Sequence, residues 1–310
     1  MKILITGAGG YIGSMLCDQL VKDGHEVIAI DYMNYSKNSL SHLFFYNNFK
    51  FINADVTSEL ILKRYLKNVN FVIPLAALVG APICEKNKKK ATNVNFHQIK
   101  TIIKLIKDNQ KIIYLNSNSG YGIGEKNKYC TEESQLNPIS HYGITKVKAE
   151  RYIIDNFKNF VCFRLATVFG YSYRMRTDLI VNYYIKEAIS LNRIKIFEPQ
   201  FRRNFIHVRD VVTAIKFAIE NFNKLKSQIY NLGLSNANIT KLQLAKKIKK
   251  IIPKLKIVIT KGIKDPDQRD YFVSNKKIES KGFKAKISLD KGIREVFQTL
   301  VLFNNHKNNY

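Results

Sequence analysis

A chain of 310 residues is long enough for two domains, or for one large α/β domain with an attached lobe. It is 45% hydrophobic and 24% charged, with only 6 prolines and 15 glycines, which excludes a disordered, collagenous or linker-dominated chain. Its formal net charge of +27 favours anionic partners but carries no information about the fold.

The first half of the chain alternates short apolar runs with segments of helical spacing. Strands are predicted at Lys2–Thr6, Glu26–Ile30, Phe49–Ile52, Asn70–Pro74, Lys111–Leu115 and Phe160–Leu165. Helices are predicted at Tyr11–Lys22, Asn93–Asp108 and His141–Phe157. Strands that are unbroken apolar runs between helices indicate a parallel sheet covered on both faces.

The pattern changes after Gly170. Residues 171–204 show no regular alternation, and the later predictions are a helix at Asp210–Asn221, a strand at Gln228–Asn231 and a basic amphipathic helix at Thr240–Ile252. We therefore expect an α/β fold, a Rossmann-type doubly wound parallel sheet with a smaller C-terminal substrate-binding lobe. Residues 1–170, with 205–232 returning to them, form the expected cofactor domain, and 171–204 and 233–310 form the lobe.

A glycine-rich turn, Gly7–Gly13, follows the first strand and opens the first helix. Gly7, Gly10 and Gly13 allow a tight turn and a close approach to a pyrophosphate, which the N–H groups of the helix start can bind. Asp31 ends the second strand 18 residues after Gly13, where a carboxylate accepts hydrogen bonds from an adenosine ribose and repels a 2′-phosphate. A glycine turn alone could be purely structural, but its place in the first βα unit together with Asp31 favours dinucleotide binding, with NAD preferred to NADP.

Asp55 and Val56 follow the third strand, at a place where an acid can meet the adenine amino group. The alternative is that Asp55 caps a helix that starts at the run beginning with Glu59.

Tyr142 and Lys146 form a YxxxK pair on a predicted helix, where residues i and i+4 share one face. A free tyrosine has a pKa near 10. A lysine ammonium and an oxidised nicotinamide ring would stabilise the phenolate and make it a base near neutral pH. Tyr46 and Lys50 also fit the spacing, but they straddle a loop-to-strand junction and have no upstream serine partner.

Ser117 lies just past the fifth strand and 25 residues before Tyr142. Its hydroxyl can hydrogen-bond the same sugar oxygen that the phenolate deprotonates, because open α/β sheets bind ligands at the carboxyl ends of their strands. The alternative is a Ser- and Asn-rich turn without chemistry.

In chain order, the sequence carries the glycine turn, Asp31, Leu75-Ala76-Ala77, Ser117, Tyr142-x-x-x-Lys146 and Arg203-Asn204-Phe205-Ile206-His207-Val208. This order resembles the extended short-chain dehydrogenases that act on nucleotide sugars, the NAD-dependent epimerase/dehydratase family. A narrower resemblance, to the GDP-D-glycero-α-D-manno-heptose 4-dehydrogenases of bacterial capsule heptose pathways, rests on Pro74–Pro82, Asn118–Lys126, Arg164–Gly170 and Asp265–Tyr271.

The resemblance implies a role for each matching residue. The catalytic residues would be Ser117, Tyr142 and Lys146. NAD would be bound by Gly7, Gly10, Tyr11, Ile12, Gly13, Asp31, Asp55, Val56, Leu75, Ala76, Ala77, Asn95, Tyr142, Lys146 and Leu165. The nucleotide sugar would contact Ser117, Asn118, Thr167, Arg174, Arg176, Asn182, Arg203 and Arg269, and no metal site is expected.

Arg203 matches an arginine that would bind the substrate diphosphate bidentately. Many relatives place a second phosphate arginine three residues before the position of Asp267, but this chain has Lys264 there. Arg269, Arg174 and Arg176 are therefore the candidates for the second diphosphate contact.

Hydride removal from C4 of the sugar is common to the branches of this family, which differ in the later steps of the reaction. A 4,6-dehydratase needs an acid–base pair directly after the catalytic serine, and this chain has Asn118 and Ser119 there. Dehydration and decarboxylation are therefore disfavoured. The reaction either stops at the 4-keto sugar, with GDP-heptose as the substrate implied by the narrower resemblance, or returns the hydride to the opposite face as a 4-epimerase.

The excess of basic residues has a second interpretation, contact with nucleic acid or a membrane surface. The lysines are scattered, with small clusters at 86–90 and 246–256, so a solvated basic surface that helps to attract a diphosphate is favoured over either contact. A redox sensor on the same fold would not need the serine, tyrosine and lysine set.

Two further expectations concern the setting of the protein. No signal peptide and no apolar run of about 20 residues is evident, and the four cysteines are far apart in sequence, so we expect a cytoplasmic protein with reduced thiols. The resemblance also implies a homodimer through the helices 93–108 and 141–157.

Overall fold

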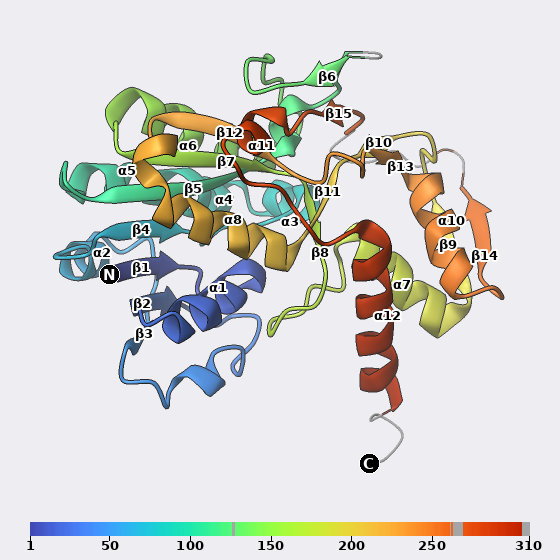
Figure 1. Ribbon diagram of the computed structural model, residues 1–310, viewed down its shortest axis with the longest axis horizontal. Coiled ribbons are helices and arrows are strands. Elements are labelled where there is room, and N and C mark those ends of the chain that lie inside the picture. The colour runs from blue at the N-terminus through green and yellow to red at the C-terminus, as the bar shows by residue number, and fades with distance from the viewer. Residues whose placement is uncertain (126–127, 261, 263–268, 306–310) are drawn as a thin grey trace.

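Seven parallel strands form one sheet in the order β12-β7-β5-β4-β1-β2-β3 (Figure 1). The computed structural model describes residues 1–125, 128–260, 262 and 269–305. The strands of this sheet are β1 (Lys2–Thr6), β2 (Glu26–Asp31), β3 (Phe49–Asn53), β4 (Phe71–Pro74), β5 (Lys111–Ser117), β7 (Phe160–Leu165) and β12 (Gln228–Leu232). The doubly wound α/β fold predicted from the sequence is confirmed. The strand order reverses between β1 and β4, and the carboxyl ends of strands at such a point are where open sheets bind ligands.

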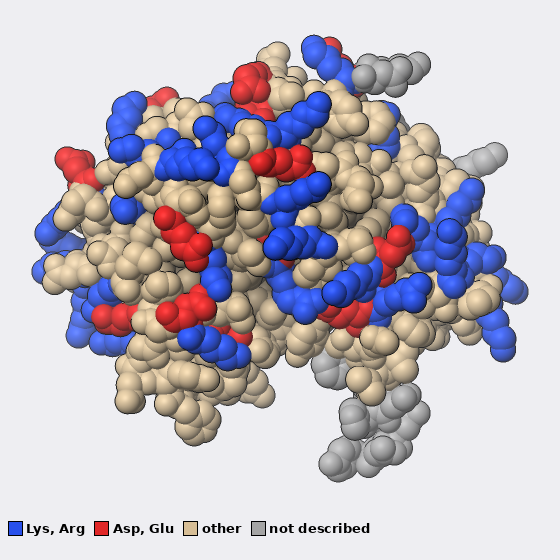
Figure 2. All heavy atoms as spheres, viewed as in Figure 1, with Lys and Arg blue, Asp and Glu red and all other residues tan. Residues whose placement is uncertain are grey.

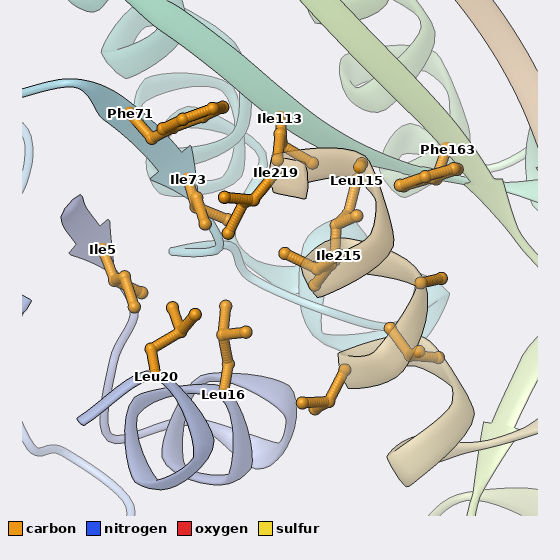
Figure 3. Packing of buried hydrophobic residues seen from close by; sticks show 14 of the residues in the cluster. Ile5, Leu16, Leu20, Phe71, Ile73, Ile113, Leu115, Phe163, Ile215 and Ile219 are labelled. Atoms are coloured by element: carbon orange, nitrogen blue, oxygen red, sulfur yellow. The ribbon is translucent and has the colours of Figure 1, made fainter. Parts of the chain in front are cut away.

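One face of the sheet is covered by α1 (Tyr11–Lys22) and α8 (Val208–Glu220). Leu16 and Leu20 from α1 and Ile215 and Ile219 from α8 point toward the apolar side chains of the strands (Figure 3). All four are at most 5% exposed, and complete burial of one such side chain contributes about 1.5–3 kcal/mol to folding. The packing of α1 against the sheet therefore fixes the position of the glycine turn, which connects β1 to α1.

The opposite face packs against α2 (Glu59–Tyr65), α5 (Gln98–Leu105) and α6 (His141–Asn156), through side chains such as Ile99, Ile102 and Ile153. The prediction of one continuous α-helix over 93–108 is wrong in its bounds and in its regularity. Residues Asn93–His97 form a π-helical turn, α5 ends at Leu105, and the short helices α3 (Ala81–Lys86) and α4 (Lys88–Thr92) precede them.

A separate apolar core joins α7 (Ile180–Leu191), α10 (Lys241–Ile251), α12 (Leu289–Asn305) and β9 (Arg193–Ile196), which lie together at one end of the molecule (Figure 1). No helix was predicted within residues 171–204, where the structure has α7. Buried side chains of α7 at Val181, Tyr184, Ile185 and Ala188 have helical spacing, but no side chain caps the start of the helix, so the usual sequence signal for a helix start is missing. The domain boundaries given above stay predictions.

The remaining elements are short. They are η1 (Ser41–Leu43), η3 (Asn118–Tyr121), β6 (Tyr129–Cys130), β8 (Thr167–Phe169), β10 (Arg202–Arg203), β11 (Phe205–His207), α9 (Phe222–Leu225), β13 (Ile239–Thr240), β14 (Lys256–Ile259), β15 (Phe272–Val273) and α11 (Lys276–Ser280). Among the described residues, no helix is both long and apolar enough to cross a membrane. Figure 2 shows lysine and arginine spread over the visible face and interspersed with acidic side chains.

Candidate active site

The turn between β1 and α1 is so tightly packed that it requires glycine. Gly7 has a φ of +70°, and a Cβ placed on it would lie 2.4 Å from the backbone nitrogen of Ala76, in the segment that follows β4. A Cβ on Gly13 would lie 2.2 Å from the carbonyl oxygen of Gly7. The turn thus lies directly against Ala76, as expected of a cradle that brings the backbone close to a bound dinucleotide.

We expect Gly7→Ala to destabilise the protein much more than Gly24→Ala. Gly24 also has a positive φ, of +80°, but nothing lies within 4 Å of a Cβ added there. Gly24→Ala should cost about 1–2 kcal/mol for the left-handed backbone alone. Gly7→Ala should cost about 1–3 kcal/mol more, because the backbone at Ala76 must move. Urea unfolding of the two variants measures the difference, and equal losses would contradict the close approach.

Asp31 holds the glycine turn at the carboxyl end of β2. Its Oδ2 accepts a hydrogen bond from the Gly9 nitrogen at 2.9 Å, and its Oδ1 accepts one from the Met33 nitrogen at 2.7 Å. The carboxylate is half-buried and fixed beside the turn, which fits the ribose-binding role predicted for it.

Asp55 does not cap α2, so the alternative raised from the sequence is wrong. Ser58 is the capping residue, and its side chain accepts from the Ile61 nitrogen. Asp55 Oδ1 instead accepts from both the nitrogen and the hydroxyl of Thr57 at 2.8 Å. The residue borders an open cavity of about 510 Å³ that is otherwise lined mainly by residues 86–90 and 93–94.

Asn95 connects the segment after β4 to the helix that carries Tyr142. It is buried in the π-helical turn, and its Oδ1 accepts from the Leu78 nitrogen at 2.8 Å. Its Nδ2 donates to the Leu78 carbonyl oxygen at 3.0 Å and lies 3.2 Å from the Thr145 hydroxyl oxygen. In the structure the Asn95 side chain therefore supports the loop that follows β4, and its contact with NAD stays a prediction.

The three predicted catalytic residues come from two elements that pack against each other. Ser117 ends β5, and its Oγ accepts from the Ser119 nitrogen at 3.2 Å, which caps η3. Tyr142 and Lys146 lie in the first two turns of α6, which packs on both β5 and η3. A Cβ on Gly143 would lie 3.2 Å from the Ser119 carbonyl oxygen, so the start of α6 lies close to the serine turn.

Lys146 is buried between α6 and β5. Its Nζ lies 4.1 Å from the centroid of the Tyr114 ring, and the Tyr114 hydroxyl donates to the Lys146 carbonyl oxygen at 3.4 Å. Burial lowers the pKa of Lys146 to about 7, although the Glu150 carboxylate acts in the opposite direction. The amine therefore changes charge near neutral pH, where it can hold or release a proton beside Tyr142.

The family model for the "NAD dependent epimerase/dehydratase family" matches residues 3–233 of the chain. The chain belongs to this family. The cofactor predicted from the sequence, NAD, is thereby confirmed, as is the family resemblance. The glycine turn and Asp31 fit a dinucleotide, since they offer a cradle that a single Cβ would fill and a fixed carboxylate beside it.

The relatives of this epimerase/dehydratase include several named as epimerases. The chain is 28% identical over 257 residues to the "Uncharacterized UDP-glucose epimerase YtcB" of Bacillus subtilis, covering 78% of this chain and 80% of the relative. It is 27% identical over 305 residues to the "Putative UDP-glucose 4-epimerase" of Methanocaldococcus jannaschii, covering 95% and 96%. The solved UDP-glucuronic acid 4-epimerase of Bacillus cereus, in complex with UDP-glucuronic acid and NAD, matches with a TM-score of 0.86 and 25% identity, covering 98% of this chain and all of that one.

Two of the predicted substrate contacts have buried side-chain polar atoms without a hydrogen-bond partner among the described residues. They are the amide of Asn118, directly after Ser117, and the hydroxyl of Thr167 in β8. Asn182, by contrast, is occupied within the protein, because its amide bonds the backbone of Gly170 and Arg176. Its predicted substrate contact would require these bonds to change.

Other predicted residues have structural contacts of their own. The Tyr11 hydroxyl donates to the Gly170 carbonyl oxygen at 2.6 Å, so its side chain joins the start of α1 to the segment after β8. Leu165 pairs in register with Ser117, which places the two residues at the same edge of the sheet.

The four predicted arginines occupy different environments. Arg176 pairs with Asp178, and the Arg174 guanidinium lies 4.7 Å from the centroid of the Tyr35 ring. Arg203 is 1% exposed and donates to the Arg202 carbonyl oxygen at 2.9 Å. Arg269 lies beside the turn that follows Ser117, with its Nη1 3.4 Å from Ser119 Oγ. Lys264 and Asp267 fall outside the described residues.

Sequence reasoning missed a buried charged group under the active site. Glu150 lies one turn beyond Lys146 on α6 and pairs with Arg164 of β7, with 2.7 Å between Oε1 and Nη2. Its Oε2 accepts from Asn116 Nδ2 at 2.6 Å. The sequence did contain a signal for this group: Glu150 follows the predicted catalytic lysine by four residues and so lies on the same face of the helix. An acid on a buried helix face needs a partner inside the protein.

Proposed function

We propose that this enzyme oxidises C4 of a nucleotide-diphosphate sugar and returns the hydride to the opposite face, as a nucleotide-sugar 4-epimerase. The observation that carries the proposal is the packing of α6, which carries Tyr142 and Lys146 in its first two turns, against the end of β5 and the η3 turn, where Ser117 lies. The relatives named as 4-epimerases support epimerisation, and their names favour UDP-sugars as the first substrates to test.

The glycine turn and Asp31 would hold NAD, which would supply the acceptor for the C4 hydride and its source for the return step. The Tyr142 phenolate takes the proton from the C4 hydroxyl, and the Ser117 hydroxyl hydrogen-bonds the same oxygen. The charged form of Lys146 lowers the pKa of the phenol, because a neighbouring positive charge stabilises the phenolate. In an epimerase, the 4-keto sugar rotates in the site so that its opposite face receives the hydride, and Tyr142 then returns the proton to the C4 oxygen.

Dehydration does not fit the residues beside Ser117. Asn118 and Ser119 stand where an acid–base pair would be needed, and neither ionises near neutral pH. The buried, unpartnered amide of Asn118 can donate to and accept from sugar hydroxyls without driving the loss of water.

The second candidate is a 4-dehydrogenase that stops at the 4-keto sugar, with GDP-D-glycero-α-D-manno-heptose as its substrate. It rests on the narrower resemblance over segments such as Pro74–Pro82 and Arg164–Gly170. None of the relatives described above carries that name, so it ranks behind the epimerase. It also needs a route to reoxidise the reduced cofactor.

Incubation of the purified protein with UDP-glucose, UDP-glucuronic acid and GDP-heptose, each deuterated at C4, separates the two candidates. An epimerase gives the C4-inverted sugar with the label retained. A dehydrogenase gives the 4-keto sugar with the label lost to the cofactor or to a second acceptor. Absence of both products for every sugar would contradict C4 chemistry, and NMR of the sugar nucleotides is the measurement.

A homodimer through α5 and α6 is part of the proposal. Phe96 and Tyr152 contribute half-buried aromatic rings to this face, with the Lys100 ammonium 5.8 and 5.4 Å from their centroids. Sedimentation of the purified chain tests it directly.

A further inference from the structure

The buried carboxylate of Glu150 is bonded on every side. Besides Arg164 Nη2, it accepts from Arg164 Nε at 3.1 and 3.2 Å, from Asn116 Nδ2 at 2.6 Å and from Cys162 Sγ at 3.3 Å. Glu150 is 1% exposed and Arg164 is 4% exposed. The remaining Nη1 of Arg164 donates to the Tyr121 hydroxyl at 3.1 Å and to the Glu132 carbonyl oxygen at 3.0 Å.

From this geometry we infer that Glu150 is a positioning residue for the proposed C4 chemistry, acting on Ser117 through Asn116 and on Lys146 through its charge. The expected effect of Glu150 on catalysis rests on the proposed function, whereas its expected effect on the pKa of Lys146 does not. The Glu150 carboxylate is bonded to Arg164, Asn116 and Cys162. Glu150 therefore acts through other residues and is not itself a catalytic residue.

The route to Ser117 is a continuous pair of hydrogen bonds. Asn116 Nδ2 donates to Glu150, and Asn116 Oδ1 accepts from the Ser117 nitrogen at 2.8 Å. The Asn116 amide is thereby fixed in one orientation, because its donor end faces the carboxylate. The backbone of Ser117 is held at the last residue of β5, just where its hydroxyl must meet the sugar oxygen.

The route to Lys146 is electrostatic. Glu150 follows Lys146 by four residues on α6, so both lie on the same buried face of the helix. On α6 the titratable groups on the face of this amine are Tyr142 and Glu150, each four residues away. Tyr114 and Cys162 lie on the two strands beneath. Burial and the Glu150 carboxylate raise the pKa of the Cys162 thiol well above its ordinary value, so the thiol is neutral and Glu150 is the negative charge that favours the ammonium.

Stability alone does not account for the pair. Replacing a buried ion pair with apolar side chains of similar volume is often neutral or stabilising, since both charges must be stripped of water. The Glu150–Arg164 ion pair lies between the last residues of β5 and Lys146 of α6. Its removal is therefore expected to affect the proposed active site as well as the apolar core.

The first test needs no substrate. Four proteins are compared: the wild type, Lys146→Met, Glu150→Gln and Glu150→Gln/Lys146→Met. The free energy of unfolding of each is measured from about pH 5 to pH 10. In each background, the difference between the protein that keeps Lys146 and its Lys146→Met counterpart reports the titration of the lysine. We expect the midpoint in Glu150→Gln to move below the wild-type value of about 7. The matched control is Glu220→Gln, an exposed acid near the end of α8, which should leave the midpoint unchanged. An unmoved midpoint in Glu150→Gln overturns the electrostatic part.

The second test uses whichever of the three sugars the wild type turns over. Glu150→Gln should lower kcat about 100-fold with little change in KM, since small misplacements of reacting groups have effects of that order. In a Ser117→Ala background the same change should cost less, because the part of its effect that acts through Ser117 is already lost and only the part through Lys146 remains. Equal losses in the two backgrounds overturn the route through Ser117.

Glu150→Gln leaves Arg164 buried without its carboxylate, and this variant can fail to fold. The double variant Glu150→Met/Arg164→Met removes both charges, and the same fall in the Lys146 midpoint and in kcat is expected of it. A lower Tm with unchanged kcat and unchanged midpoint would show a purely structural pair and overturn the inference. If the wild type acts on none of the sugars, the proposed function fails, while the Lys146 titration still decides the inference.

Discussion

Tyr142→Phe should reduce C4 oxidation about 10²–10⁴-fold while leaving the fold intact. The phenolic oxygen is the proposed proton acceptor, and general acid–base catalysis contributes about this factor. The ring itself packs beside the small cluster of Leu78, Cys84 and Ala91, and phenylalanine retains that packing. The measurement is single-turnover formation of reduced cofactor at 340 nm with the sugar that the wild type accepts.

The matched control is Tyr46→Phe. Tyr46 and Lys50 have the same YxxxK spacing, but Tyr46 lies in a loop and is 39% exposed, and Lys50 lies in β3. This variant should keep full activity, and both variants should keep their affinity for NAD. An undiminished rate in Tyr142→Phe would remove the basis of the proposed mechanism.

Lys146→Met should abolish most activity and should also change how stability depends on pH. The folded protein holds the pKa of Lys146 at about 7, well below its ordinary value near 10.5. Between these pH values the unfolded chain binds a proton that the folded chain does not, so this residue makes stability rise as the pH increases from about 7 to about 10.5. Below about pH 7 the full cost of the buried ammonium is present.

The variant lacks this cost, so we expect Lys146→Met without cofactor to be more stable than the wild type at pH 6, with the difference shrinking toward pH 10. Urea unfolding at several pH values measures it, and other titrating groups cancel in the comparison. Lys148→Met is the control, because Lys148 is exposed on the same helix and should give no such trend. A difference that is constant with pH would contradict a depressed pKa at Lys146.

Local patterns in the sequence were enough for the sheet and the family, and they supplied the three residues that are proposed to be catalytic. The glycine turn, Asp31 and the YxxxK pair each lie within one βα unit, and their chemistry depends on spacing along a single strand or helix. The apolar runs likewise located the parallel strands, because strands buried on both faces have no polar alternation to disguise them.

Tertiary structure decided what depends on contacts between distant segments. Glu150, Arg164 and Asn116 come from α6, β7 and β5, and only the packing of these elements makes one buried network of them. The sequence also missed α7, whose apolar stripe finds its partners in α10 and α12 much later in the chain. The depressed pKa of Lys146 has the same origin, because burial against β5 removes water from an amine that the sequence presents as an ordinary lysine.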